Sequence, residues 1–180
     1  DGNRLFTGLQ AASTISSFDL YTKQIVKSFS VLDSVALNGS FWRAGSLVAV
    51  PNQTDSVVVV RTPLDVTEYA SSEVVYDDGV PRPNINKTLM TTVRPGADPY
   101  SVYGTNWSLQ NARGEHAFYR VVIDSNGISS ATFLGPVLLV RAITPFVYES
   151  GRLLTNAGQV RSPDTKSLLG SFPLPSPWGT

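Results

Sequence analysis

The feature that most constrains the fold of this chain is a hairpin signal at Asn126-Gly127. A two-residue type I′ turn needs positive φ at both central positions, and Asn and Gly adopt that conformation at the least cost. The run before it, 117–123, is aromatic and β-branched, and the run after it, 131–143, is apolar and interrupted only at Gly135-Pro136. The sequence therefore predicts two long antiparallel strands whose register pairs Asp124 with Ser129, Ile123 with Ser130, Val122 with Ala131 and Arg120 with Phe133.

A second hairpin is predicted over residues 40–62, with its turn at 52–55. Its first strand ends at Pro51, and Trp42, near the start of that strand, is expected in the core. Its second strand, 56–62, contains four consecutive Val residues. Because neighbouring side chains of a strand point to opposite faces, such a run predicts a strand that is covered on both faces.

Other parts of the chain are less regular. In residues 17–37 the apolar side chains have near-helical spacing, but the Ser, Thr, Val and Phe content favours strands. Residues 77–103 are rich in Pro and predict a long surface excursion with one strand near 87–93. That excursion leads through an aromatic loop, 100–107, into the Asn126-Gly127 hairpin.

Short runs of β-forming residues separated by turns at roughly ten-residue intervals predict an all-β fold. We expect an antiparallel β-sandwich or barrel, jelly-roll-like, of about 8–10 strands. Residues 1–16 are predicted to be a linker or the strand by which the chain enters the domain, and 17–170 a single β-sandwich domain. Residues 171–180 are predicted to form an extended, Pro-rich tail.

Composition excludes several functional classes. The 14 basic and 14 acidic residues balance and form no run of like charge, so no nucleic-acid partner is expected. The chain has no Cys, hence no disulfide and no thiolate site, which favours assembly in a reducing compartment. No apolar run approaches the ~20 residues of a spanning helix, so no membrane insertion is expected. Four N-glycosylation patterns begin at Asn38, Asn52, Asn86 and Asn106.

No catalytic site is predicted. A Ser-His-Asp arrangement would have to use His116, the only histidine, and the nearest acid on its strand face is Asp124. If 116–124 is one strand, eight residues separate these side chains by roughly 27 Å, so a triad would need an acid from another strand. We therefore expect a chain that is not an enzyme and that takes no cofactor.

No metal site is predicted either. One His and no Cys cannot furnish a usual zinc site. The acids of Asp77-Asp78-Gly79 could hold calcium, but a plain Asp-Gly turn with solvated carboxylates is the more common meaning of that pattern.

The best binding candidate is an aromatic group formed by Tyr100, Tyr103 and Trp107. Aromatic side chains on the loops of a rigid sandwich can stack on sugar faces or anchor a protein partner. The alternative is that Trp107 closes the end of the sandwich core. Trp178 would pin the tail to the surface or to a neighbouring subunit.

The whole chain resembles, in style, the protruding domain of the capsid protein of small non-enveloped RNA viruses such as insect nodavirus-like, Lake Sinai virus-like and tombusvirus-like particles. The resemblance rests on the cysteine-free, near-neutral, Ser/Thr/Val-rich composition, the Pro-rich stretch 81–99, the extended tail 171–178 and the N-terminus 1–4, which looks like the cut edge of a longer polypeptide. The segment 113–120, RGEHAFYR, also brings to mind iflavirus protruding domains, which have been linked to a hydrolase-like Ser-His-Asp set; only His116 carries over.

The resemblance implies a structural and host-receptor attachment module on the capsid surface of the virion, made in the host cytoplasm. Its partners would be other copies of the capsid protein, clustered as dimers or trimers of protruding domains, and a host cell-surface receptor such as a glycan. Two alternatives stay open: a stand-alone carbohydrate-binding or adhesion module that uses Tyr100, Tyr103 and Trp107, and a weak hydrolase that depends on His116.

Overall fold

A computed structural model describes residues 3–8, 13–32, 42–63, 71–88, 90–106, 115–138, 146–165 and 167–173. The described residues form an all-β protein without helices, so the predicted fold class is confirmed. They contain 15 strands, more than the sequence predicted, because short strands of two to four residues carry too few alternating positions to be recognised.

The strands form four antiparallel sheets, and in each sheet the strands follow one another in chain order. Every sheet is thus a meander, without the crossover connections of a jelly roll. Sheet A contains β1 (Arg4–Gly8), β2 (Thr14–Asp19) and β3 (Gln24–Ser30). Sheet B contains β4 (Trp42–Ala49), β5 (Ser56–Pro63), β6 (Ser72–Asp77) and β7 (Val80–Pro81). Sheet C contains β8 (Thr92–Pro95), β9 (Ser101–Asn106), β10 (Glu115–Asp124) and β11 (Gly127–Leu138). Sheet D contains β12 (Val147–Glu149), β13 (Arg152–Leu154), β14 (Gln159–Arg161) and β15 (Leu168–Ser171).

Sheet B is covered on both faces, as the four consecutive Val residues predicted. Val57 and Val59 pack with Ile15 and Val31, which belong to sheet A and the residues that follow it. Val58 and Val60 point the other way and pack with side chains of sheet C such as Val121. The alternation of side chains along β5 therefore places sheets A and C on opposite faces of sheet B. Trp42 is buried, as predicted.

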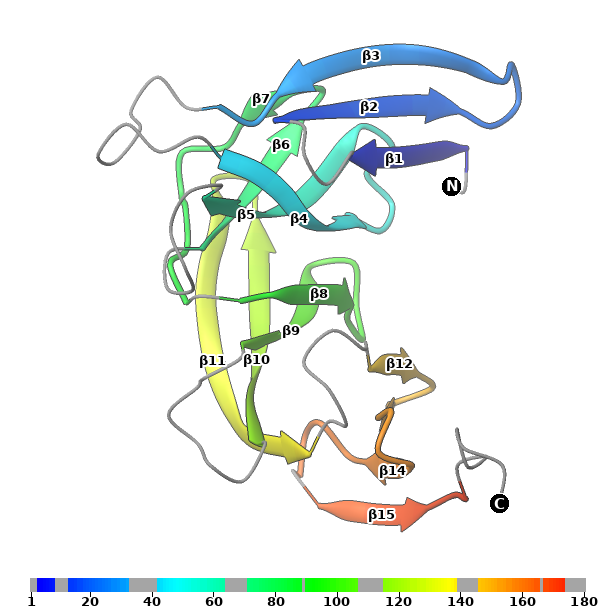
Figure 1. Cartoon of the computed structure of the whole chain (residues 1–180), viewed down its shortest axis with the longest axis vertical. Coiled ribbons are helices and arrows are strands. Elements are labelled where there is room, and N and C mark those ends of the chain that lie inside the picture. The colour runs from blue at the N-terminus through cyan, green and yellow to red at the C-terminus, as the bar shows by residue number, and fades with distance from the viewer. Residues whose placement is uncertain are drawn as a thin grey trace.

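Sheet C is also covered on its second face. Tyr103 and Phe118 of sheet C pack against Phe146 and Leu153, so sheet D, with the residue that leads into it, lies on that side. The long strands β10 and β11 run between the two ends of the molecule, with sheet A at one end and sheet D at the other (Figure 1). The predicted hairpin is thus the longest structural element and joins the layers.

The predicted register of that hairpin is wrong. The observed pairs are Asp124 with Gly127, Ile123 with Ile128, Val122 with Ser130 and Arg120 with Thr132. Asp124 Oδ1 accepts a hydrogen bond from the Asn126 backbone N at 2.7 Å, and only Gly127, at φ 120°, takes positive φ. The loop is therefore Ser125-Asn126 rather than Asn126-Gly127, and two bulges, at 122/123 and 118/119, adjust the pairing farther along.

The predicted surface excursion of residues 77–103 is partly wrong as well. Met90 and Val93 are fully buried between sheets B and C, and the strand lies at Thr92–Pro95. Residues 101–106, expected in an aromatic loop, form β9 in the interior of sheet C. Proline content predicts irregular backbone, but it does not predict that the segment crosses the core instead of the surface.

The described residues at both ends of the chain include strands. Residues 4–8 and 14–19 are paired strands, and Ile15 is fully buried. The strand interpretation of 17–37 is confirmed for residues 17–19 and 24–30; residues 33–37 lie outside the described part. At the C-terminal end β15 is an edge strand, and of the predicted tail 171–180 the structure describes residues 171–173.

Candidate functional site

The structure separates the aromatic side chains that the sequence grouped together. Tyr103 is only 1% exposed, since its ring packs on Phe118 (ring centroids 5.3 Å apart) and on Tyr148 (4.9 Å). Burial raises the pKa of its hydroxyl to about 12. A ring enclosed in this way has no free face for a sugar or a partner. Trp107 lies outside the described residues.

Of the two tyrosines in that group, both of which the structure describes, Tyr100 has a free face. The residue is 59% exposed, and it lies on the turn that joins β8 to β9. Asp98 braces this turn: its Oδ1 accepts a hydrogen bond from the Tyr100 backbone N at 2.9 Å, and its Oδ2 pairs with Arg120 Nη2 at 2.9 Å. The Tyr100 backbone O also accepts a hydrogen bond from the Ile123 N. The ring is therefore presented on an ordered backbone.

His116 lies near the start of β10, and Asp124 is the last residue of the same strand. The two residues thus share one continuous strand, which is the condition on which the distance between their side chains was estimated. The side chain of His116 is not among those that the structure describes. Within the described residues, no three His, Cys, Asp or Glu side chains lie close enough to hold a metal ion.

The carboxylates of the Asp77-Asp78 turn are engaged by basic side chains. Arg82 donates from Nε and Nη2 to the two carboxylate oxygens of Asp77, each at 2.7 Å, and Ser56 Oγ donates to the same group at 2.6 Å. The hydrogen bonds from Arg82 hold the pKa of Asp77 below its usual value, against the opposing effect of partial burial. Asp78 pairs with Lys27 at 2.7 Å. In the structure these acids connect separate segments of the chain through their basic partners.

Arg82 also joins sheets B and C. Its Nη2 donates to the Gln53 side-chain oxygen at 2.6 Å, and its Nη1 donates to the backbone O of Asp124. The neighbouring Asn84 makes two backbone hydrogen bonds with the hairpin tip: its N donates to the Asn126 O, and its O accepts from the Ile128 N. The segment 82–84 therefore holds the β10–β11 turn against sheet B.

The carboxylate of Glu73 is the most deeply buried acid among the described residues, and sequence reasoning did not single it out. Its oxygens accept hydrogen bonds from the Asn86 amide at 2.7 Å, from the Thr88 backbone N and hydroxyl, and from the Met90 backbone N at 2.9 Å. Burial raises the pKa of Glu73, and the hydrogen bonds oppose that rise without cancelling it. A sequence signal for this burial existed. Glu73 is two residues before the core residue Val75, and residues two apart on a strand point to the same face, so the alternation places Glu73 on a buried face.

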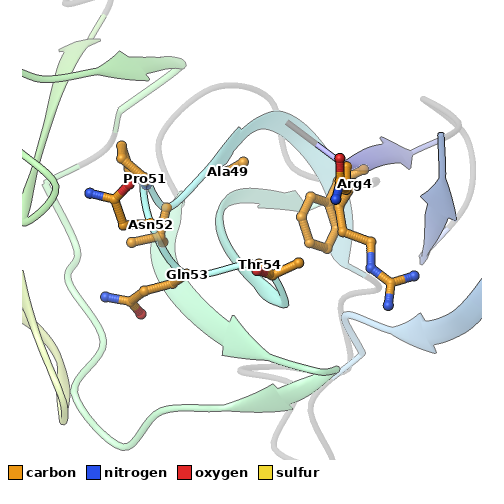
Figure 2. Close-up of a pocket in the computed structure, with 9 residues that line it drawn as sticks. Arg4, Ala49, Pro51, Asn52, Gln53 and Thr54 are labelled. Atoms are coloured by element: carbon orange, nitrogen blue, oxygen red, sulfur yellow. The ribbon is translucent and has the colours of Figure 1, made fainter. Parts of the chain in front are cut away.

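A pocket of about 180 Å³ lies between the first strand and the β4–β5 turn. Asn3, Arg4 and Phe6 form one part of its lining and residues 49–54 form the other. Figure 2 shows Arg4 on one side, Pro51, Asn52 and Gln53 on the opposite side, and Ala49 and Thr54 between them. The pocket could not be found from the sequence, since its two walls are more than 40 residues apart and contain no motif.

No helix formed by the described residues is both long and apolar enough to cross a bilayer. Comparison of the sequence with protein-family models and with curated proteins finds no match.

Proposed function

We propose that this chain is a surface domain of a non-enveloped virus capsid, a structural and receptor-attachment module without catalytic activity. The proposal rests on which of the described side chains are buried or paired within the chain and which are left exposed. Sheets B and C are buried on both faces, and the ionic side chains at their turns pair with one another, as Arg82 does with Asp77 and Arg120 with Asp98. The large side chains left for outside contacts lie on turns and edge strands.

The shape of the molecule supports the same proposal. The sheets follow one another along the longest axis, with sheet A at one end and β15 at the other (Figure 1). An elongated stack of meanders can present turns at a distance from whatever its ends are attached to. Binding residues are typically placed on such turns because the rigid sheets position them.

Tyr100 is the residue that we assign to attachment. An exposed ring on a turn that is already ordered loses little conformational entropy when it stacks on a sugar or enters a shallow pocket. Replacement of Tyr100 by Ala should weaken binding to glycans, or to cells that carry the receptor, by about tenfold or more. Because the ring is exposed, the melting temperature should stay nearly unchanged.

The experiment is a glycan array followed by titration of the best ligand with the wild-type chain and with Tyr100→Ala. Phe133→Ala is the matched control, because Phe133 is also an exposed aromatic residue but lies on the strand β11. Equal binding by wild type and Tyr100→Ala would remove Tyr100 from the site. Absence of binding to any glycan and to any host-derived cell would count against the attachment role itself.

The same exposed ring also favours a second candidate, a stand-alone carbohydrate-binding module. The two functions differ in what the chain does without a ligand. A capsid surface domain should associate with other copies of itself, whereas a carbohydrate-binding module should bind its glycan as a monomer. The state of association of the purified chain therefore discriminates between them.

A further inference from the structure

The turn between β2 and β3 presents an unusually exposed aromatic side chain. Tyr21 is 90% exposed, and the neighbouring Leu20, Ile25 and Val26 are exposed as well. Leu20 and Tyr21 lie on the turn itself, and Ile25 and Val26 lie at the start of β3, so this end of the hairpin carries more exposed apolar side chains than the single ones that are common on surfaces, which favours contact with a partner. We call these four residues the apolar tip.

The apolar tip is held in a fixed shape. Asp19 Oδ1 accepts hydrogen bonds from the backbone N of Tyr21 at 2.9 Å and of Thr22 at 2.8 Å, and Lys23 adopts positive φ at 57°. The bond from Thr22 is the main reason why the pKa of Asp19 lies below its usual value. A rigid turn that already projects an aromatic ring loses little entropy when the ring enters a pocket.

A pocket of suitable size lies beside the tip. The volume of about 180 Å³ exceeds the ~150 Å³ of a protein cavity that accepts benzene, so one phenol ring can enter. Phe6, Ala49, Val50 and Pro51 supply apolar lining. Asn3 and Asn52 also line the pocket, and their amide groups offer hydrogen-bond partners for a hydroxyl.

Tip and pocket are tied together by direct contacts. The Leu20 backbone N donates to the Asn3 backbone O at 2.9 Å. Arg4, in the wall of the pocket, pairs with Asp19 at the base of the tip (3.8 Å) and with Asp55 at the end of the β4–β5 turn (3.4 Å). The projecting ring and the pocket are therefore neighbours on the side of the molecule where β1 begins.

We propose that this side is an interface between two copies of the chain, in which Tyr21 of each copy fills the pocket of the other. A projection and a pocket that lie side by side on one surface are self-complementary about a two-fold axis, the usual symmetry of homodimers. A second copy is the occupant that accounts for both features at once. The acids and the guanidinium at this surface pair within the chain, and the chain has no net charge, so identical copies do not repel one another.

The inference rests on the proposed function, because a surface domain that clusters needs a contact between copies. It goes further by naming the residues of that contact and its symmetry. The contact uses neither Tyr100 nor the turn on which Tyr100 lies, so self-association and ligand binding can be measured separately.

Sedimentation velocity of the full chain, from low micromolar to near-millimolar concentration, tests the interface. We expect a reversible monomer–dimer equilibrium for the wild type and for Tyr21→Phe, which keeps the ring. Tyr21→Ser should weaken the dimer by roughly 30-fold or more, as expected for an aromatic anchor. Ala49→Arg, which places a long side chain at the pocket, should have a similar effect; both positions are exposed, so folding should be unaffected.

Mixing the two variants gives the decisive measurement. Tyr21→Ser keeps its pocket and Ala49→Arg keeps its tyrosine, so a heterodimer retains one of the two contacts that each homodimer has lost. The mixture should associate more strongly than either variant alone. Leu169→Ser on β15 is the control for general stickiness, because Leu169 is also exposed but lies at the opposite end of the molecule (Figure 1) and should leave the dimer intact.

A wild-type chain that stays monomeric at the highest concentration would overturn the interface, as would a dimer that neither variant weakens. A mixture that associates no better than its components would show that Tyr21 and the pocket do not meet. If glycan or cell binding persists in those cases, the inference fails while ligand binding stands, and a chain that binds glycan as a strict monomer favours the carbohydrate-binding module. If a Tyr21-dependent dimer forms but no receptor or glycan binds, the attachment role fails and the interface stands.

Discussion

Gly127 shows how a single residue can serve two purposes at once. Its φ of 120° is a conformation that side chains rarely adopt, and a Cβ at this position would lie 2.4 Å from the backbone O of Asn84. The first requirement comes from the turn and could be foreseen from the sequence. The second comes from the segment 82–84, which presses on the hairpin tip and is more than 40 residues away along the chain.

We predict that Gly127→Ala destabilises the protein more than Gly135→Ala does. Gly135 has almost the same φ, 119°, but no atom lies within 4 Å of the position of its Cβ. Gly135→Ala should therefore cost only the backbone strain, about 1–2 kcal/mol. Gly127→Ala should cost about 1–3 kcal/mol more because Asn84 must move. Urea unfolding of both variants measures the difference, and equal losses would mean that the contact with Asn84 is unimportant.

Glu73 makes the stability of the protein depend on pH in an unusual direction for a carboxylate. Its folded-state pKa is raised above the ordinary value of 4.5, chiefly by burial. Folding therefore favours the protonated form of Glu73. This preference adds to the free energy of unfolding, and the added stability is fully present at pH values below the ordinary pKa. That contribution is lost as the pH rises through the raised pKa. Most paired carboxylates, including Asp77, act in the opposite sense.

We therefore predict that the wild type loses stability relative to Glu73→Gln as the pH rises above the ordinary pKa of Glu. Urea unfolding of both proteins at a series of pH values measures this difference, from which the effects of the other carboxylates cancel. Glu149→Gln is the matched control, since Glu149 is exposed. A pH-independent difference between wild type and Glu73→Gln would show that Glu73 does not titrate differently in the folded state.

At the scale of the element, β5 is the strand whose burial on both faces is predicted most directly by its own sequence. Its consecutive Val residues are fully buried, and they divide between the cluster shared with sheet A and the cluster shared with sheet C. Branched side chains suit a strand because their restricted rotamers match the pleated surface. A strand with one face in water would show alternation instead, and β5 does not.

We predict that Val57→Ala and Val58→Ala destabilise the protein by similar amounts, about 2–3 kcal/mol each. The two side chains face opposite sheets, so similar losses are the signature of a strand that is buried on both sides. Val26→Ala in β3, where the side chain is half exposed, should change the stability by no more than about 0.5 kcal/mol. If one of the two buried positions tolerated Ala as well as position 26 does, one face of sheet B would have to be open.

The hairpin β10–β11 shows where element-level reasoning ends. Its existence and its approximate extent follow from the residues themselves, although β11 runs unbroken through Gly135-Pro136. Its register does not, because Asp124 competes for the turn by binding the Asn126 N and so shifts the loop by one residue. Turn preferences differ by small free energies, and one side-chain hydrogen bond is enough to change the choice.

At the scale of the whole molecule, Arg82 connects sheet B with sheet C: three of its hydrogen bonds go to Asp77 and Gln53 on the side of sheet B, and one goes to the backbone O of Asp124 in sheet C. It ties β6, the β4–β5 turn and the hairpin tip to one guanidinium. The segment that carries it is rich in Pro and polar residues, which is why the sequence predicts a surface excursion there. A mostly buried Arg is tolerated here because its Nε, Nη1 and Nη2 atoms all donate to acceptors in the folded chain.

The sequence by itself determines the all-β class, the two central hairpins and the double burial of β5, because periodicity and turn preference act over a few residues. The tertiary structure alone decides that Tyr103 is buried while Tyr100 is free, that Glu73 has its partners in residues 86–90, and that residues 3–6 and 49–54 enclose a pocket beside Tyr21. These outcomes depend on which face of each sheet meets another sheet, and that choice is made by contacts between segments far apart in the chain.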